Sequence, residues 1–302
     1  MISLVRDIPP TPQTRQPILA FRQVSKSFKS VQALDQVDFD IYPREVVAVV
    51  GDNAAGKSVL AKTIAGVYRP ESGVVFWDGA PTDISSPSAA QELGIATIFQ
   101  ELALCDNMSI VQNLFLGREL TGPVAIADNE MEEIARTVFR ELGAKIPPVR
   151  TLVADLSAGQ RQITAIARAM LGSPRIVIMD EPTSSLSVTQ TAEVLNLIEQ
   201  LRELGYGVMF ISHTLSDLQA VADRIVVMRH GRVNGEGSMD EVTYEDIIAA
   251  ITGVPNELTR ATKERGPLGP PTALTEINAA LPLPARHVPK PQTTARQSRT
   301  SQ

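Results

Sequence analysis

The sequence has little cysteine and little histidine, and each shortage excludes a class of protein. The single cysteine, Cys105, excludes an internal disulfide framework and a cysteine-rich zinc site. The three histidines, His213, His230 and His287, lie far apart and lack metal-ligand spacing. No apolar run approaches the roughly 20 residues that a membrane-spanning helix needs, and the N-terminus has no signal-peptide pattern. We therefore expect a soluble protein of a reducing compartment.

An excess of positive charge is lacking as well. Lys and Arg number 28 against 34 Asp and Glu, which gives a net charge of -6. Such mild acidity argues against a nucleic-acid binder that relies on phosphate neutralisation, so we expect no nucleic-acid partner. The 302 residues are 43% hydrophobic and 21% charged, which is enough to bury a sizeable core.

Proline is unevenly distributed and marks the two ends of the chain. Of the 21 prolines, four fall in residues 1–17 and eight in residues 255–302. The C-terminal segment also has seven Lys or Arg against three Glu, a charge of +4. We expect an N-terminal extension over 1–17 and a basic, Pro-rich tail over 255–302 that does not order itself. Docking of the tail on a partner or on anionic lipid is the alternative.

The segment between these ends, 18–254, has the pattern of one α/β domain. Residues 18–24 and 34–41 alternate apolar and polar residues, which is typical of half-buried antiparallel strands, whereas 45–50 is a continuous β-branched run typical of a strand buried on both faces. Further short strands and amphipathic helices alternate after it, which predicts a parallel sheet. The expected strands are 95–99, 176–179, 208–211 and 225–228, and the expected helices are 57–67, 130–142, 160–171 and 191–204. Residues 102–171 are predicted to form an inserted helical subdomain.

A phosphate-binding loop follows the buried strand directly. The segment fits the pattern G-x-x-x-x-G-K-[ST], in which a glycine permits the turn, backbone N–H groups surround an anion and the following helix adds its positive end. Lys57 is expected to reach the β- and γ-phosphates and the Ser58 hydroxyl to ligate Mg²⁺. An ordinary glycine-rich turn is the alternative. The residues are Gly51, Asp52, Asn53, Ala54, Ala55, Gly56, Lys57 and Ser58.

Two carboxylates end another buried strand. Asp180 and Glu181 close the run from Ile176, and ligands of α/β sheets bind at the carboxyl ends of strands. We expect Asp180 to hold Mg²⁺, directly or through water, and Glu181 to act as general base toward the attacking water. Alone, the pair could equally be an exposed turn before Pro182.

Further motifs make the chain resemble the ATP-binding cassette (ABC) ATPases over roughly residues 18–254. The segment 156–160, Leu-Ser-Ala-Gly-Gln, is similar to the family signature L-S-G-G-Q. Gln100 resembles the glutamine of the Q-loop, Ser184–Ser187 the D-loop, His213 the switch histidine and Phe28 the aromatic residue that stacks on adenine. The resemblance implies a P-loop NTPase (RecA-like) core with an antiparallel β subdomain and an inserted α-helical subdomain.

The resemblance also implies the roles of the site residues and a second cassette. ATP and Mg²⁺ are the expected cofactors, with Ser58, Gln100 and Asp180 at the metal and Glu181, His213 and Gln100 in catalysis. In the family two cassettes pair head to tail, so that the signature of one closes over the ATP of the other. The implied ATP-binding residues are Phe28, residues 51–58, Val59, Ser157, Ala158, Gly159 and Gln160.

Four positions depart from the family pattern. Ala54 stands where many members have glycine, Val59 where threonine is usual, Ala158 at the first signature glycine and Ser187 at the D-loop aspartate. Loss of the Thr hydroxyl at 59 removes a hydrogen bond worth about 1 kcal/mol. Ala158 keeps its N–H, so phosphate binding should survive, whereas Ser187 puts signalling between cassettes in doubt. Active hydrolysis is still expected.

Residues 100–119 resemble the carbohydrate-importer branch of the family, which favours Gln-Glu after the Q-loop strand, the stretch Asn-Leu-Phe-Leu-Gly-Arg-Glu and serine in the D-loop. The resemblance implies an ATPase that drives sugar import through a separate permease at the cytoplasmic face of the inner membrane. Its expected partners are the permease, a second cassette (first of all another copy of this chain) and, indirectly, a solute-binding protein. The alternatives are a soluble ABC ATPase acting on ribosomes or nucleic acid, and a regulatory cassette that binds ATP but hydrolyses little.

Overall fold

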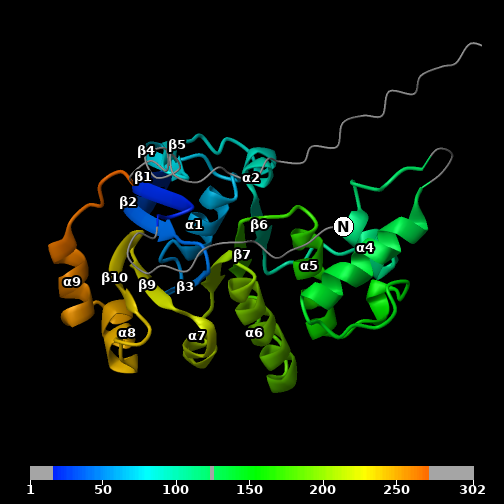
Figure 1. Ribbon diagram of the computed structural model, residues 1–302. Coiled ribbons are helices and arrows are strands. Elements are labelled where there is room, and N and C mark those ends of the chain that lie inside the picture. Colours follow the sequence, from blue (N-terminus) through cyan, green and yellow to red (C-terminus); the bar gives the residue numbers. More distant parts are fainter. Residues whose placement is uncertain (1–15, 123–125, 272–302) are drawn as a thin grey trace, which may run out of the picture.

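The computed structural model describes residues 16–122 and 126–271. A six-stranded sheet with the order β10-β9-β3-β8-β7-β6 runs through the molecule (Figure 1). Five of its strands are parallel and only β10 is antiparallel to its neighbour, which confirms the predicted parallel sheet. The strands are β3 (Glu45–Gly51), β6 (Ile95–Ile98), β7 (Ile176–Asp180), β8 (Gly207–Ile211), β9 (Arg224–Arg229) and β10 (Arg232–Ser238).

A smaller antiparallel sheet, β2-β1-β4-β5, lies beside it. The two strands expected at its start are present and longer than the alternation indicated. Two further strands of this sheet were not predicted, because their glycine, serine and proline give no strand pattern. The strands are β1 (Leu19–Phe28), β2 (Val31–Ile41), β4 (Ser72–Trp77) and β5 (Ala80–Pro81).

Alternate residues of the central strands enter two different cores. On β3, Val46, Ala48 and Val50 face one core, whereas Val47 and Val49 face the other. A strand with helices or sheet on both faces must be apolar at every position, which explains the unbroken β-branched run in this segment. The second core lies between the two sheets and includes α1 (Lys57–Ile64).

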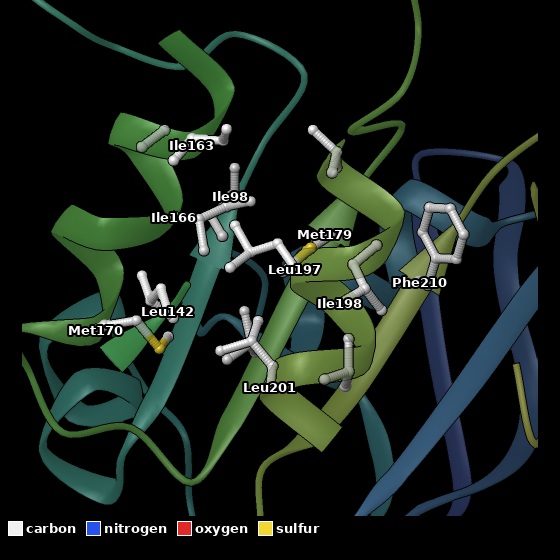
Figure 2. Close-up of a cluster of buried hydrophobic side chains, with 14 of the residues drawn as sticks. Ile98, Leu142, Ile163, Ile166, Met170, Met179, Leu197, Ile198, Leu201 and Phe210 are labelled. Carbon is white, nitrogen blue, oxygen red and sulfur yellow. The ribbon is translucent and has the colours of Figure 1, made fainter. Parts of the chain in front are cut away.

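The first core is formed mainly by helices packed on the other face of the sheet. Figure 2 shows Ile166 and Met170 of α5 (Ala158–Met170) facing Leu197 and Leu201 of α6 (Val188–Glu203), with Ile98 of β6 and Met179 of β7 in the same cluster. The remaining elements are α2 (Pro87–Leu93), α3 (Ile110–Phe115), α4 (Asp128–Glu141), a 3-10 turn (Val153–Asp155), α7 (Leu215–Val221), α8 (Tyr244–Thr252) and α9 (Glu257–Arg265). Within 102–171 the helices are joined by long loops, so this region is less helical than expected.

The prediction that the chain does not order itself beyond residue 254 is wrong for the start of that segment. Helix α9 begins at the cap of Asn256 and buries Leu258, which is 7% exposed. Arg265 pairs with Glu236 of β10, and the Leu268 N–H donates to Asp38 of β2. The sequence of α9 has only one buried leucine, and its other contacts are polar, so it lacks the apolar periodicity that would predict a helix. The predictions for 1–15 and 272–302 lie outside the described residues.

Within the described ranges, 16–122 and 126–271, the structure contains no helix that is both long and apolar enough to cross a membrane.

Candidate nucleotide site

Four neighbouring strands bring most of the predicted catalytic residues to one edge of the sheet. Asp180, the last residue of β7, pairs in register with Ile211 of β8, and His213 follows Ile211 by two residues. On the other side of β8 the strand β3 ends at Gly51, and on the far side of β7 the strand β6 ends two residues before Gln100. The carboxyl ends of parallel strands therefore gather the phosphate loop, both carboxylates, His213 and Gln100.

The phosphate loop has the backbone of an anion-binding turn. Gly51 and Gly56 have positive φ angles of 150° and 106°. A Cβ at Gly51 would lie 2.2 Å from the carbonyl oxygen of Met228, and one at Gly56 2.5 Å from that of Ala33, so only glycine fits at either place. Ala54 also has a positive φ, 62°, which costs a residue with a Cβ about 1–2 kcal/mol. This strain is the local consequence of alanine at a position where glycine is common.

Lys57 is placed at the mouth of this loop. Its ammonium group donates to the carbonyl oxygens of Gly51, at 2.8 Å, and Asp52, at 2.9 Å. Only 6% of the residue is exposed. Burial lowers the pKa of Lys57, while the charges of Glu181, Asp180 and Asp52 oppose that shift. The Lys57 ammonium is thus held by two backbone carbonyls and interacts with the charges of three carboxylates.

Asp180 and Ser58, two of the residues predicted to hold Mg²⁺, lie next to each other and share a side-chain hydrogen bond. Burial raises the pKa of Asp180, and a hydrogen bond to the Ser58 side chain partly offsets that shift. No cluster of three His, Cys, Asp or Glu side chains in the described part of the chain is arranged to hold a metal. Mg²⁺ is usually held by one or two carboxylates together with substrate phosphates rather than by a complete protein cage. Asp180, the Ser58 hydroxyl and the exposed Gln100 fit that mode of binding.

Glu181 and His213 form a close pair at the same edge. The Nε2 atom of His213 lies 2.6 Å from Oε1 of Glu181. The Glu181 N–H donates to the carbonyl oxygen of Ile211, and the residue has a positive φ of 53°. Because an L-residue seldom adopts this backbone without compensation, the turn after β7 fixes the direction of the carboxylate.

The signature residues lie away from this edge. Ser157 caps α5: its hydroxyl accepts from the N–H of Gln160, and the Gln160 side chain accepts from the N–H of Ser157. Figure 1 shows α5 on the opposite side of β6 and β7 from α1, the helix that follows the phosphate loop. Ser157, Ala158 and Gln160 are therefore not brought to the phosphate loop of the same chain.

Gly159 of the signature touches the start of α6. A Cβ at this position would lie 3.0 Å from both Cβ and Cγ of Gln190. Gln190 itself completes the cap of α6, where Ser187 is the N-cap residue. The sequence analysis missed this role of Ser187, although the spacing Ser-x-x-Gln is a recognisable helix-capping signal.

Phe28 lies at the end of β1 and is 38% exposed. Its ring meets the ring of Tyr68 edge to face, with the centroids 4.8 Å apart, and the Lys26 ammonium lies 5.4 Å from its centroid. Tyr68 did not figure among the predicted residues. The adjoining strand β2 contacts the phosphate loop, since Ala33 limits the space at Gly56. Phe28 is thus an exposed aromatic ring on a hairpin next to that loop.

Comparison with known proteins extends over most of the domain. Residues 34–184 match the ABC transporter family. The chain is 40% identical over 244 residues to the putative ribose/galactose/methyl galactoside import ATP-binding protein 2 of Burkholderia cenocepacia, which is 80% of this chain and 48% of that protein. It is 40% identical over 235 residues to the xylose/arabinose import ATP-binding protein XylG of Sulfolobus acidocaldarius, 78% of this chain and 94% of that protein.

The fold has solved counterparts. An ATP-binding cassette of an ABC transporter superposes with a TM-score of 0.70 at 24% identity, covering 79% of this chain and 98% of the other. The chain spans about half the length of the Burkholderia relative and nearly all of the Sulfolobus relative. With the family match, the identity to these relatives and the fold in agreement, the chain belongs to the ABC transporter family and contains an ATP-binding cassette with the P-loop NTPase fold.

Proposed function

We propose that the chain binds ATP with Mg²⁺ and hydrolyses it to drive the import of a sugar through a separate membrane permease. The observation that carries this proposal is the meeting of Lys57, Asp180, Glu181 and His213 at one edge of the sheet. The import ATP-binding relatives support the direction of transport and the class of solute. They do not support the alternative of a soluble ATPase acting on ribosomes or nucleic acid.

ATP would bind with its phosphates against the loop 51–58. The backbone N–H groups of Asp52, Asn53, Ala54, Ala55, Gly56 and Val59 would surround them, with the N-terminal end of α1 adding partial positive charge. Lys57 would exchange its two carbonyl acceptors for phosphate oxygens. The exposed ring of Phe28 would stack on the adenine. Ser58, Asp180 and Gln100 would hold Mg²⁺, which supplies neutralisation of phosphate charge.

Hydrolysis would follow from the pair at the strand ends. Glu181 would accept a proton from the water that attacks the γ-phosphorus in line with the leaving oxygen, and His213 would hold both the carboxylate and the γ-phosphate. Most of the rate acceleration would come from positioning and charge stabilisation. The intact Glu181 favours this reaction over a regulatory cassette that only binds ATP.

A second cassette would complete each site. The capped start of α5 is an anion-binding helix end, and it lies away from the chain's own phosphate loop (Figure 1). Ser157, Ala158, Gly159 and Gln160 would therefore face the γ-phosphate held by a partner, and another copy of this chain is the first candidate. The permease and, through it, a solute-binding protein would be the remaining partners, at the cytoplasmic face of the inner membrane.

The ATPase rate of the full chain as a function of its concentration tests the proposal. A rate rising with the square of concentration, abolished by Lys57→Ala, is the expected result. A rate strictly proportional to concentration would mean either that the dimer is already saturated or that the monomer hydrolyses ATP alone. Sizing of the Glu181→Gln variant with ATP separates the two cases: a stable dimer supports composite sites, and a monomer excludes them.

Coupling to import needs a separate measurement. Affinity purification of the full chain from detergent-solubilised membranes of its own cells should recover an integral-membrane protein. That protein should accelerate ATP hydrolysis by the chain when both are reconstituted in lipid vesicles. Recovery of ribosomal proteins or nucleic acid in its place would overturn the transport role and leave the ATPase assignment standing.

A further inference from the structure

The ring of Tyr68 packs against the ring of Phe28 from a different part of the chain. Phe28 ends β1, whereas Tyr68 follows α1. The ring centroids are 4.8 Å apart and the ring planes meet at 72°, which is an edge-to-face arrangement. Such a pair is more stable than its buried area alone would make it. The contact therefore joins the end of β1 to the segment that follows α1.

The end of α1 fixes the position of Tyr68. The N–H groups of Val67 and Tyr68 both donate to the carbonyl oxygen of Lys62, at 2.8 Å and 3.2 Å. Gly66, just before them, has a positive φ of 73°, and a Cβ there would lie 2.3 Å from the carbonyl oxygen of Ser86, so only glycine permits this turn. Helix α1 begins within the phosphate loop. One short helix therefore joins Tyr68 to that loop.

Lys26, another neighbour of the Phe28 ring, is held less firmly. Its ammonium group lies 5.4 Å from the ring centroid and 3.3 Å from Oε1 of Glu71. The Glu71 side chain is half exposed, and ion pairs exposed in this way contribute little to stability. The ammonium is also carried on a flexible four-carbon stem. A base that arrives at Phe28 can therefore displace Lys26, whereas Tyr68 stays in place.

We propose that Tyr68 is a positioning residue for the nucleotide base. Because α1 joins Tyr68 to the phosphate loop, its ring contact fixes the ring of Phe28 relative to that loop. Without the contact, the partly exposed ring of Phe28 would gain rotational freedom, which base binding would then have to remove. The inference rests on the proposed function, because it takes from it that the base stacks on Phe28. Tyr68 would thus strengthen the binding of ATP and contribute nothing to the binding of phosphates that lack a base.

Two ligands separate this role from support of the phosphate loop. Isothermal titration calorimetry of the full chain with Mg²⁺ gives dissociation constants for ATP and for inorganic tripolyphosphate, which has three phosphates and no base. Tyr68→Ala should raise the constant for ATP about threefold to tenfold and leave that for tripolyphosphate unchanged. Tyr68→Phe keeps the ring and should bind ATP as the parent does. Tyr68→Leu, which keeps apolar volume without a ring, takes the place of Tyr68→Ala should the latter lower the melting temperature.

A second pair of variants tests whether Tyr68 acts through Phe28. Phe28→Ala should weaken the binding of ATP and spare that of tripolyphosphate, because it removes the ring on which the base stacks. Adding Tyr68→Ala to Phe28→Ala should then cause little further loss, since the ring that Tyr68 holds is gone. Val67→Ala is the matched control. It changes an exposed neighbour at the same end of α1 and should leave the binding of both ligands unchanged.

The contrary outcomes are distinct from one another. Equal weakening of ATP and tripolyphosphate by Tyr68→Ala would mean that Tyr68 supports the phosphate loop instead. A full effect of Tyr68→Ala in the Phe28→Ala background would mean that it does not act through the ring. Unchanged ATP binding in Tyr68→Ala, beside weakened binding in Phe28→Ala, would overturn the inference and leave the proposed function intact. Unchanged ATP binding in Phe28→Ala itself would overturn the stacking role in the proposed function, and this inference with it.

Discussion

The Nε2 atom of His213 lies 2.6 Å from Oε1 of Glu181, at the adjacent carboxyl ends of two parallel strands. The strand register fixes this relationship, since β7 and β8 pair residue by residue up to Asp180 and Ile211. A carboxylate and an imidazole this close can together bind a water molecule, and the carboxylate can accept a proton from it.

Glu181→Gln should lower the ATP hydrolysis rate by about 10²–10⁴-fold, the usual contribution of a general base. The amide keeps the shape of the side chain but has no basic oxygen. ATP binding, measured by equilibrium titration at 4 °C, should stay within a few-fold of the parent. Hydrolysis at the parental rate would show that another group accepts the proton.

Asp180→Asn should stabilise the nucleotide-free chain at neutral pH while abolishing hydrolysis. Burial raises the pKa of Asp180 above its ordinary value of 3.8, so the ionised carboxylate costs stability in the folded state. That cost is complete above the folded pKa and disappears as pH falls through 3.8, where the carboxyl is protonated in both states. Melting curves should therefore show a gain in melting temperature for the variant at pH 7 that shrinks toward pH 4. A gain independent of pH would mean that ionisation of Asp180 is not its cause.

Ser187→Ala should lower the free energy of unfolding by about 1 kcal/mol, because the hydroxyl that caps α6 is lost. Ser187→Asp should preserve the cap, since a carboxylate accepts the same hydrogen bond and favours the helix N-terminus. Urea unfolding of the two variants measures the difference. Equal destabilisation by alanine and aspartate would indicate that the hydroxyl matters for something other than capping.

Truncation after residue 256 should destabilise the chain, whereas truncation after residue 271 should not. The longer deletion removes Leu258, whose burial alone is worth about 2 kcal/mol, and Arg265, which pairs with Glu236. The shorter deletion keeps α9 and also keeps Leu268 and Gly269, which contact Asp38 of β2 and Arg22 of β1. Thermal melts of both products against the full chain give the comparison. Equal melting temperatures for all three would contradict a structural role of α9.

The parts of the fold that the sequence predicted share one property: their chemistry is local. The turn at Gly51, the buried run before it and the strand-end carboxylates follow from residue types and spacing alone. Strand β10 has two glycines and four polar or charged residues in the run Arg232–Ser238, and it pairs because β9 offers an edge. Helix α9 likewise depends on the surface of β10. The polar, glycine-rich run of β10 shows no strand pattern of its own although its partner β9 directly precedes it, and α9 could not be predicted because its stabilisation comes from β10 rather than from its own sequence.

For the candidate site, too, the sequence predicted the local features and missed the contacts between distant segments. Motif order identified the residues at the strand ends, whereas the contact between Gly159 and Gln190 joins two segments about 30 residues apart. The capping role of Ser187 is predictable in principle, because its spacing to Gln190 is that of a capping box.

The contact between Gly159 and Gln190 constrains how this chain can vary. A methyl group at position 159 would meet the side chain of Gln190 at 3.0 Å, and any shortening of Gln190 to make room would take the reciprocal cap from α6. Residues 159 and 190 therefore have to change together. Homologues that carry a larger residue at the first should have changed the second and recovered the helix cap by other means, and a designer who grafts a different signature onto this cassette has to transplant the start of α6 with it.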